Sequence, residues 1–129
     1  MDAAQSLSEL TEISSQILAA VIVDEQGSVA ASTLADGAAL AEAGRALLSQ
    51  AAAGRDGAEP TQLEAATEEG SVFALRDGGR TIVATTGARP TVGLVFYDLK
   101  SALRTLEPAK PAAKPKKPRA PRKKADDAA

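Results

Sequence analysis

Apolar and polar positions change their spacing several times along the chain, and each change delimits one expected element. The first apolar residues recur at intervals of three and four, at Leu7, Leu10, Ile13 or Ser14, and Ile17. This period predicts an amphipathic helix from about Ala3 to Leu18. The run Ala19 to Val23 is entirely apolar and rich in β-branched residues, and it precedes the turn sequence Asp24-Glu25-Gln26-Gly27. We expect it to pair as a hairpin with Ser28 to Thr33.

A second helix is predicted from Gly37 or Ala38 to about Ala53. Asp36 is its expected N-cap, and Gly54 and Gly57 end it. One side of this helix carries Leu40, Gly44, Leu47, Leu48 and Ala51.

Three strands are expected next. Thr61 to Thr67 alternates polar with apolar residues and has only one apolar side, so it is a candidate sheet edge. Glu68-Glu69-Gly70 turns the chain into Ser71 to Arg76, and Asp77-Gly78-Gly79 then joins that strand to Thr81 to Thr86 as a hairpin.

The last element follows Pro90. Apolar residues fall four, three, four and three apart, at Val92, Phe96, Leu99, Leu103 and Leu106. That spacing predicts a terminal helix. The β-branched and aromatic residues of Val92 to Tyr97 also permit a sixth strand, but the period and Pro90 at the entry favour the helix. The order is therefore α-β-β-α-β-β-β-α, with five strands and helices on both faces of the sheet, an α/β sandwich.

Charge divides the chain into two parts. The net charge is −2, but residues 1–106 hold 7 Lys or Arg against 14 Asp or Glu, whereas residues 107–129 hold 8 against 3. Residues 1–106 carry the apolar periodicity and are expected to form one domain. The segment after them is rich in lysine, proline and alanine, and this composition predicts a disordered basic tail.

Composition also limits the reactions and metal sites that the chain can support. The 129 residues contain no cysteine and no histidine, which excludes thiol chemistry and metal sites built on these ligands. The acids scatter over turns and helix faces without a pair expected to converge, and the glycines lack the spacing and the lysine of a P-loop. We expect no enzyme activity, no cofactor and no metal.

The N-terminus indicates where the protein works. Met1-Asp2-Ala3-Ala4 carries an acid where an export signal has basic residues, and the apolar run Ile17 to Val23 is far shorter than the roughly 20 residues that span a bilayer. We expect a cytoplasmic protein.

Three features together resemble bacterial roadblock/LC7 domain proteins: the order of elements, the strand-turn-strand Ala20 to Val29, and the entry to the last helix, Pro90 to Leu99. The resemblance covers residues 3 to 106. It implies a roadblock sandwich of the longin-profilin type with an antiparallel-rich sheet. A third possible function class is a ligand-sensing α/β domain of the profilin or longin type, and a protein of that class would need an apolar pocket.

The resemblance also implies self-association. Roadblock proteins form homodimers, or heterodimers with a related chain, through the middle helix and the third strand. Carried over to this sequence, the dimer interface comprises Leu40, Gly44, Leu47, Leu48, Leu63, Glu64 and Ala65. An open edge strand and a glycine that permits close helix approach fit this interpretation, although the leucines are equally explained as ordinary core.

Members of the family bind small Ras-like GTPases as regulators or platforms, so the resemblance implies such a partner. Arg45 and Gln50, outside the leucine stripe of the middle helix, are the candidate GTPase contacts, and a solvated helix face also explains them. An arginine finger from Arg45 or Arg55 is physically conceivable, but the family gives no general warrant for it.

The basic tail has chemistry of its own. Its cations are Lys110, Lys114, Lys116, Lys117, Arg119, Arg122, Lys123 and Lys124. They can bind nucleic-acid phosphates by counterion release, an anionic membrane, or an acidic face of the partner or of the chain's own domain. The sequence therefore predicts a non-enzymatic dimeric regulator or scaffold of a small GTPase with a basic tether. The alternative is a polyanion-binding protein in which the domain only dimerises.

Overall fold

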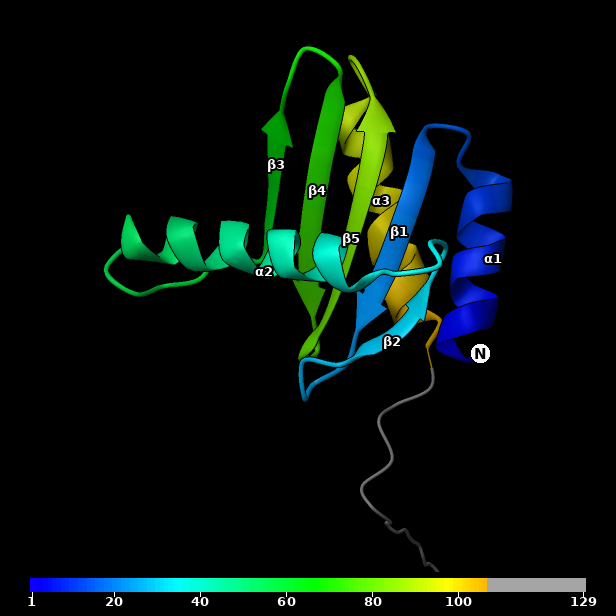
Figure 1. Cartoon of the computed structure of the whole chain (residues 1–129), viewed down its shortest axis with the longest axis horizontal. Helices are drawn as coiled ribbons and strands as arrows, with labels where there is room; N and C mark the ends of the chain where they lie inside the picture. Colours follow the sequence, from blue (N-terminus) through cyan, green and yellow to red (C-terminus); the bar gives the residue numbers. More distant parts are fainter. Residues whose placement is uncertain (107–129) are drawn as a thin grey trace, which may run out of the picture.

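The computed structural model describes residues 1–106, which form one sheet and three helices (Figure 1). The elements are α1 (Ala3–Ile13), β1 (Ile17–Val23), β2 (Val29–Ser32), α2 (Ala38–Ala53), β3 (Gln62–Ala66), β4 (Gly70–Asp77), β5 (Arg80–Gly87) and α3 (Val92–Arg104). All neighbouring strands pair antiparallel, in the order β2-β1-β5-β4-β3. The expected order of elements and the five-stranded sheet are confirmed. The predicted tail, residues 107–129, lies outside the described residues.

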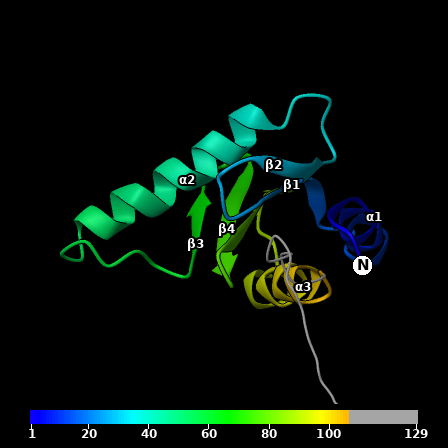
Figure 2. The same ribbon diagram turned by 90° about the horizontal axis from the view of Figure 1, so that it is seen from below.

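The sheet separates two helical layers. α1 and α3 lie side by side against one face, and α2 crosses the other face (Figure 2). Alternation along the strands assigns each residue to a face: Phe73 and Leu75 of β4 join the core under α1 and α3, whereas Val83 of β5 joins the cluster under α2. The sheet is therefore buried on both faces, which explains why β1 is entirely apolar and why β4 and β5 are continuously apolar in their middles, at residues 72–75 and 82–84.

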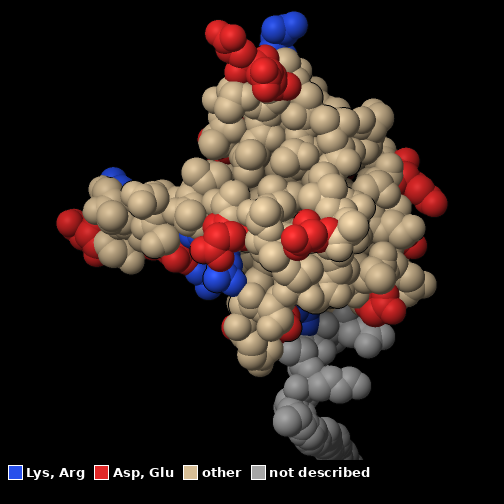
Figure 3. All heavy atoms as spheres, in the orientation of Figure 1, with Lys and Arg blue, Asp and Glu red and all other residues tan. Residues whose placement is uncertain are grey.

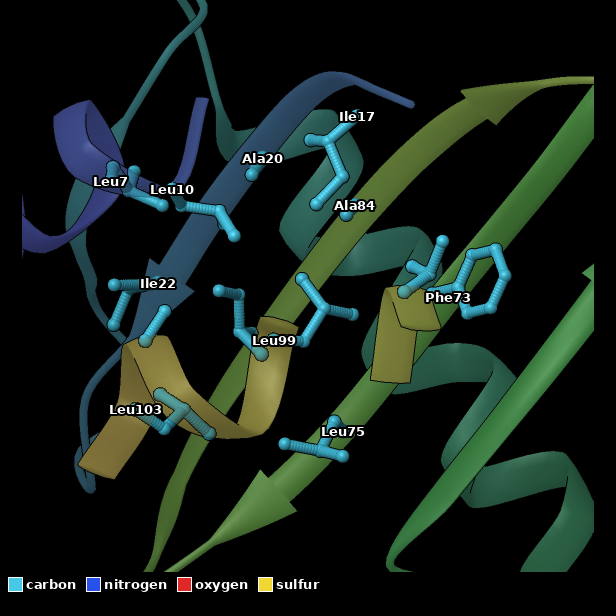
Figure 4. Close-up of a cluster of buried hydrophobic side chains, with 13 residues drawn as sticks. Leu7, Leu10, Ile17, Ala20, Ile22, Phe73, Leu75, Ala84, Leu99 and Leu103 are labelled. Carbon is cyan, nitrogen blue, oxygen red and sulfur yellow. The ribbon is translucent and has the colours of Figure 1, made fainter. Parts of the chain in front are cut away.

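The larger core lies between the sheet and the pair α1 and α3 (Figure 4). Leu7 and Leu10 of α1 and Leu99 and Leu103 of α3 point toward the strands there. Phe73 is completely buried, and its ring meets that of Phe96 edge to face at 5.0 Å. In this arrangement the positive edge of one ring meets the negative face of the other, and the contact anchors the first half of α3 to β4.

The predicted first helix is wrong at its C-terminal end. α1 ends at Ile13 instead of Leu18, because Ser14 takes an extended conformation as the C-cap and donates its N–H to the Leu10 carbonyl. Ile17 belongs to β1, and Ile13 is 74% exposed. Ile17 continues the helical spacing by coincidence, and the β-branched run that it begins belongs to the sheet.

The hairpin and terminal helix were predicted correctly. Gly78 and Gly79 have φ of +65° and +86°, and they form the two-residue loop between Asp77 and Arg80 that needs positive φ at both positions. Val92 to Tyr97 is helical, which excludes a sixth strand. The buried stripe of α3 includes Val95 and Ala102, whereas Val92 stays 38% exposed.

The N-cap of α2 lies one residue later than expected. Gly37 is the N-cap, and Asp36 Oδ1 accepts the N–H of Ala38 at 3.0 Å. The helix then presses Gly44 against β5. A methyl group on Gly44 would lie 2.3 Å from Cγ2 and 2.8 Å from Cγ1 of Val83. Because both methyls belong to a stiff, fully buried β-branched side chain, only glycine fits at this crossing.

We predict that Gly44→Ala destabilises the fold in spite of the better helix propensity of alanine. The new methyl must lift α2 off the sheet, and overpacking of this kind costs about 1–3 kcal/mol. The matched control is Gly93→Ala in α3, where an added Cβ meets nothing within 4 Å, and which we expect to be neutral or stabilising by up to ~1 kcal/mol. Urea denaturation measures both. Equal free energies of unfolding for the two variants would contradict the tight contact between α2 and β5 at Gly44.

Candidate protein-binding surface

The β3 edge of the sheet is open. Within residues 1–106, β3 pairs only with β4. The opposite edge strand, β2, has four residues and lies beside α1. The expectation of an edge at Thr61 to Thr67 is therefore confirmed for Gln62–Ala66, and this edge can accept another strand.

Two hydrogen bonds reveal which backbone groups of β3 face outward. The Thr67 N–H binds the Gly70 carbonyl at 2.8 Å, and the Arg76 N–H binds the Thr61 carbonyl at 2.7 Å. Odd-numbered residues therefore direct their backbone groups toward β4. Because successive residues alternate in an antiparallel ladder, Gln62, Glu64 and Ala66 present their N–H and C=O groups at the open edge.

α2 extends past this edge (Figure 1). Its fully buried residues, Ala41, Gly44 and Leu48, all precede Ser49. The remaining residues of the helix, 49–53, are half-buried or exposed. The C-terminal part of α2 therefore lies beyond β3, with no strand of residues 1–106 beneath it.

The residues predicted for a dimer interface fall into two groups. Gly44 and Leu48 are buried against the chain's own sheet, so the close approach that Gly44 permits is made to Val83. Leu40 and Leu47 on α2, and Leu63, Glu64 and Ala65 on β3, are half-buried.

On β3, Leu63 and Ala65 share the α2 face, because they lie opposite Ala74 and Val72. Glu64 faces the α3 side and accepts a 2.7 Å hydrogen bond from the Ser71 hydroxyl. The open edge therefore combines small apolar groups on one face with a carboxylate on the other.

The outer face of α2 was predicted from the sequence as a contact surface only at Gln50. It is a row of exposed, mostly small residues spaced by four and three: Ala39, Ala43, Ala46, Gln50 and Ala53. We call this row the alanine stripe. Charged side chains on this side of the molecule are few and scattered (Figure 3). The spacing was visible in the sequence, but the leucine stripe on the opposite side gave the stronger signal.

Arg45 is held on the flank of α2, away from the stripe. Its Nη1 donates to the Gly27 carbonyl at 2.8 Å, and its Nη2 lies 3.5 Å from Glu42 Oε1. Gln50, the other predicted contact, is exposed within the stripe. The two residues therefore do not form one site.

Arg45 also lines a cleft of about 310 Å³ between α2, the β1–β2 turn and the β4–β5 turn. The arginines in and around this cleft are paired with carboxylates: Arg76 with Glu59, and Arg80 Nε with Glu25 at 3.9 Å. Paired charges of both signs do not make a phosphate cradle. Arg45 therefore ties α2 to a turn, and nothing in its geometry presents it as an arginine finger.

Residues 1–106 contain no group of three or more acidic, histidine or cysteine side chains that could hold a metal ion. In the same range, no helix combines the length and the apolar character needed to cross a membrane.

Comparison with solved structures identifies the architecture. A roadblock/LC7 domain from Streptomyces avermitilis matches 81% of this chain and 94% of its own length, with a TM-score of 0.69 at 18% sequence identity. The chain has the roadblock/LC7 fold. MglB from Myxococcus xanthus matches 78% of this chain and 84% of its own length, with a TM-score of 0.55 at 19% identity. MglB in a tetrameric arrangement matches 81% and 84%, with a TM-score of 0.60 at 18% identity.

No family model and no curated protein matches the sequence. At 18–19% identity, the likeness to these solved structures is one of backbone fold.

We predict that Arg45 contributes to stability through its contact with Gly27. Arg45→Ala removes the exposed hydrogen bond to Gly27 together with the exposed ion pair to Glu42, and we expect the free energy of unfolding to fall by about 1 kcal/mol. Arg55→Ala is the matched control, because the Arg55 side chain has no hydrogen bond or ion pair with another residue of the described range. Thermal and urea denaturation measure both variants. A neutral Arg45→Ala would show that the contact does not fix the turn.

Proposed function

We propose that this protein is a non-enzymatic, dimeric regulator or scaffold of a small Ras-like GTPase. The observation that carries the proposal is the open β3 edge beneath the overhanging end of α2. Roadblock and MglB proteins form a family of small-GTPase regulators that are generally non-enzymatic, and the shared fold supports the same role here.

Self-association follows from the edge. A second copy that adds its own β3 in antiparallel fashion pairs Gln62, Glu64 and Ala66 with the same residues of its partner, and the two-fold axis makes the contact self-complementary. The partner's β3 then lies beneath the free end of α2, where it covers half-buried Leu47 and Ala51. A related roadblock chain can take the place of the second copy.

The GTPase is proposed to dock on the α2 side of the dimer. The alanine stripe lets another backbone approach closely, since alanine side chains project little and lose almost no conformational entropy on burial. Gln50 lies within this stripe and can supply a directional hydrogen bond there. Arg45 lies on the flank and can contact the partner only at the rim of the contact.

The dimer is tested by Ala66→Pro. The substitution removes an outward N–H without removing a bond to β4, and symmetry makes this a loss of two hydrogen bonds per dimer, about 2 kcal/mol, which raises the dissociation constant about 30-fold. Ala66→Ser keeps the N–H and serves as the control. Sedimentation equilibrium reads the mass.

Gln62→Pro is a second variant, at the other end of β3, that likewise removes an outward N–H and no bond to β4. Folded proline variants that dimerise as tightly as Ala66→Ser would overturn the β3 interface.

GTPase binding is tested with the small Ras-like GTPases of the source organism, purified with GTP analogue or GDP. The full chain and a truncation lacking residues 108–129 are expected to bind one of them equally. Ala46→Arg, which places a charged side chain in the middle of the alanine stripe, should weaken that binding at least about tenfold, whereas Glu68→Arg in the β3–β4 turn should not.

The alternative function, polyanion binding through the tail, is tested by the same proteins. Two results together would favour the polyanion-binding function. The full chain would be retained on DNA or anionic vesicles while the truncation lacking residues 108–129 would not, and neither the full chain nor the truncation would bind a GTPase. The eight cations of the tail are the feature that supports this alternative.

A further inference from the structure

A shallow groove of about 80 Å³ lies between α1 and α3, on the side of the molecule opposite α2. Its apolar wall consists of Leu10 and Ala102, which are 3% and 7% exposed, and of Ile13, which is 74% exposed. Glu9 on α1 and Asp98 on α3 line it together with small hydroxyl residues. The groove is therefore apolar at its base and acidic at its rim.

The two carboxylates have no cation partner within residues 1–106. The ion pairs there involve Glu25, Glu42, Glu59 and Asp77. Residues 1–44 contain no lysine or arginine at all. Lys100 and Arg104, the cations of α3, line a different hollow beside β4, where Arg104 Nε lies 3.2 Å from Asp77 Oδ2. The groove consequently carries an uncompensated negative charge.

The end of α3 leads directly out of this groove. Thr105, the C-cap, is one of its lining residues, and its hydroxyl donates to the Ala102 carbonyl at 2.9 Å. Leu106 is half-buried against the larger core. The sequence then continues with residues 108–124, which contain eight lysines and arginines, five prolines and no acid.

We propose that the groove between α1 and α3 is the docking site of the chain's own basic segment, residues 108–124. The segment reverses direction after Leu106 and lies along α3 toward Asp98. Lysine stems and proline rings cover the apolar base while the ammonium groups meet Glu9 and Asp98, as amphipathic side chains do on apolar surfaces.

The lengths are compatible. Thr105 to Asp98 spans seven helical residues, or ~10 Å at 1.5 Å per residue. Lys110 follows Thr105 by five residues, or ~15 Å at 3.1 Å per residue of extended polyproline-like chain. Lys110 can therefore reach the carboxylates after a turn at Pro108.

Covalent connection favours this occupant over a separate partner. Exposed ion pairs are individually weak and are screened by salt, so a free peptide in so small a groove would dissociate readily. A segment that begins at the groove has an effective concentration in the millimolar range, which lets weak contacts persist. Docking also removes cations that a polyanion would otherwise bind, so the two interactions compete.

The test uses the full chain with a spin label at Ala113→Cys, the only cysteine in the molecule because the natural sequence has none. Paramagnetic broadening of backbone amides then reports which surface the segment visits. We expect broadening of Ile13 and Ser101 at about 0.1 M salt. At ~1 M salt, where the screening length falls to about 3 Å, we expect these amides to broaden no more than those of α2.

Two charge variants locate the contact. Glu9→Gln with Asp98→Asn should abolish the broadening, whereas Glu68→Gln with Glu69→Gln, which removes two acids from the β3–β4 turn, should preserve it. A mixture of ¹⁵N-labelled chain without the spin label and unlabelled chain with it should show none.

Three results would overturn the proposal. The first is no broadening in the groove at low salt. The second is equal loss of broadening in both charge variants, which would mean diffuse attraction to the acidic domain. The third is broadening in the mixed sample, which would assign the groove to a tail of a second copy.

Discussion

The contact between Gly44 and Val83 fixes the position of α2 on the sheet. A side chain at residue 44 would overlap both methyl groups of Val83, so the helix crosses β5 at the smallest spacing that its backbone allows. Ala41 and Leu48 then reach the sheet one turn to either side. With the crossing fixed there, a helix of 16 residues ends beyond β3, and the overhang results from helix length and from the place of the glycine.

This constraint makes the two faces of the sheet unequal. The face under α1 and α3 contains a large closed cluster, whereas the cluster under α2 contains four fully buried residues. One edge strand is short and lies beside α1, while the other has outward backbone groups and a helix end above it. The outward backbone groups of β3 and the free end of α2 thus lie next to each other on one side of the molecule.

Much of the fold could be predicted from the sequence because local signals agreed with each other. The Gly78-Gly79 loop, the β-branched strands and the period of α3 each indicate one structure. The end of α1 was missed because Ile17 fits a helical period and begins a strand equally well. Only the extended backbone of Ser14 separates these possibilities, and that choice is made by packing of β1 in the sheet.

The candidate surface was less predictable, for a physical reason. A leucine stripe indicates that one side of a helix is buried but not against what, and here Leu48 and Gly44 face the chain's own sheet. The alanine stripe carries a weak signal, because alanine is common on buried and exposed helix faces alike. The register of β3, and with it the identity of the outward amides, depends on pairing that no single strand encodes.

Hydrogen exchange of the β3 amides tests most directly whether this edge is the association surface. If the copies meet at this edge, the N–H groups of Gln62, Glu64 and Ala66 become protected from exchange as the protein concentration is raised through the association range, while amides of solvent-exposed turns do not change. If the mass of the particle increases with concentration and these three amides continue to exchange at the rate of the monomer, the sheet edge is not where the copies meet.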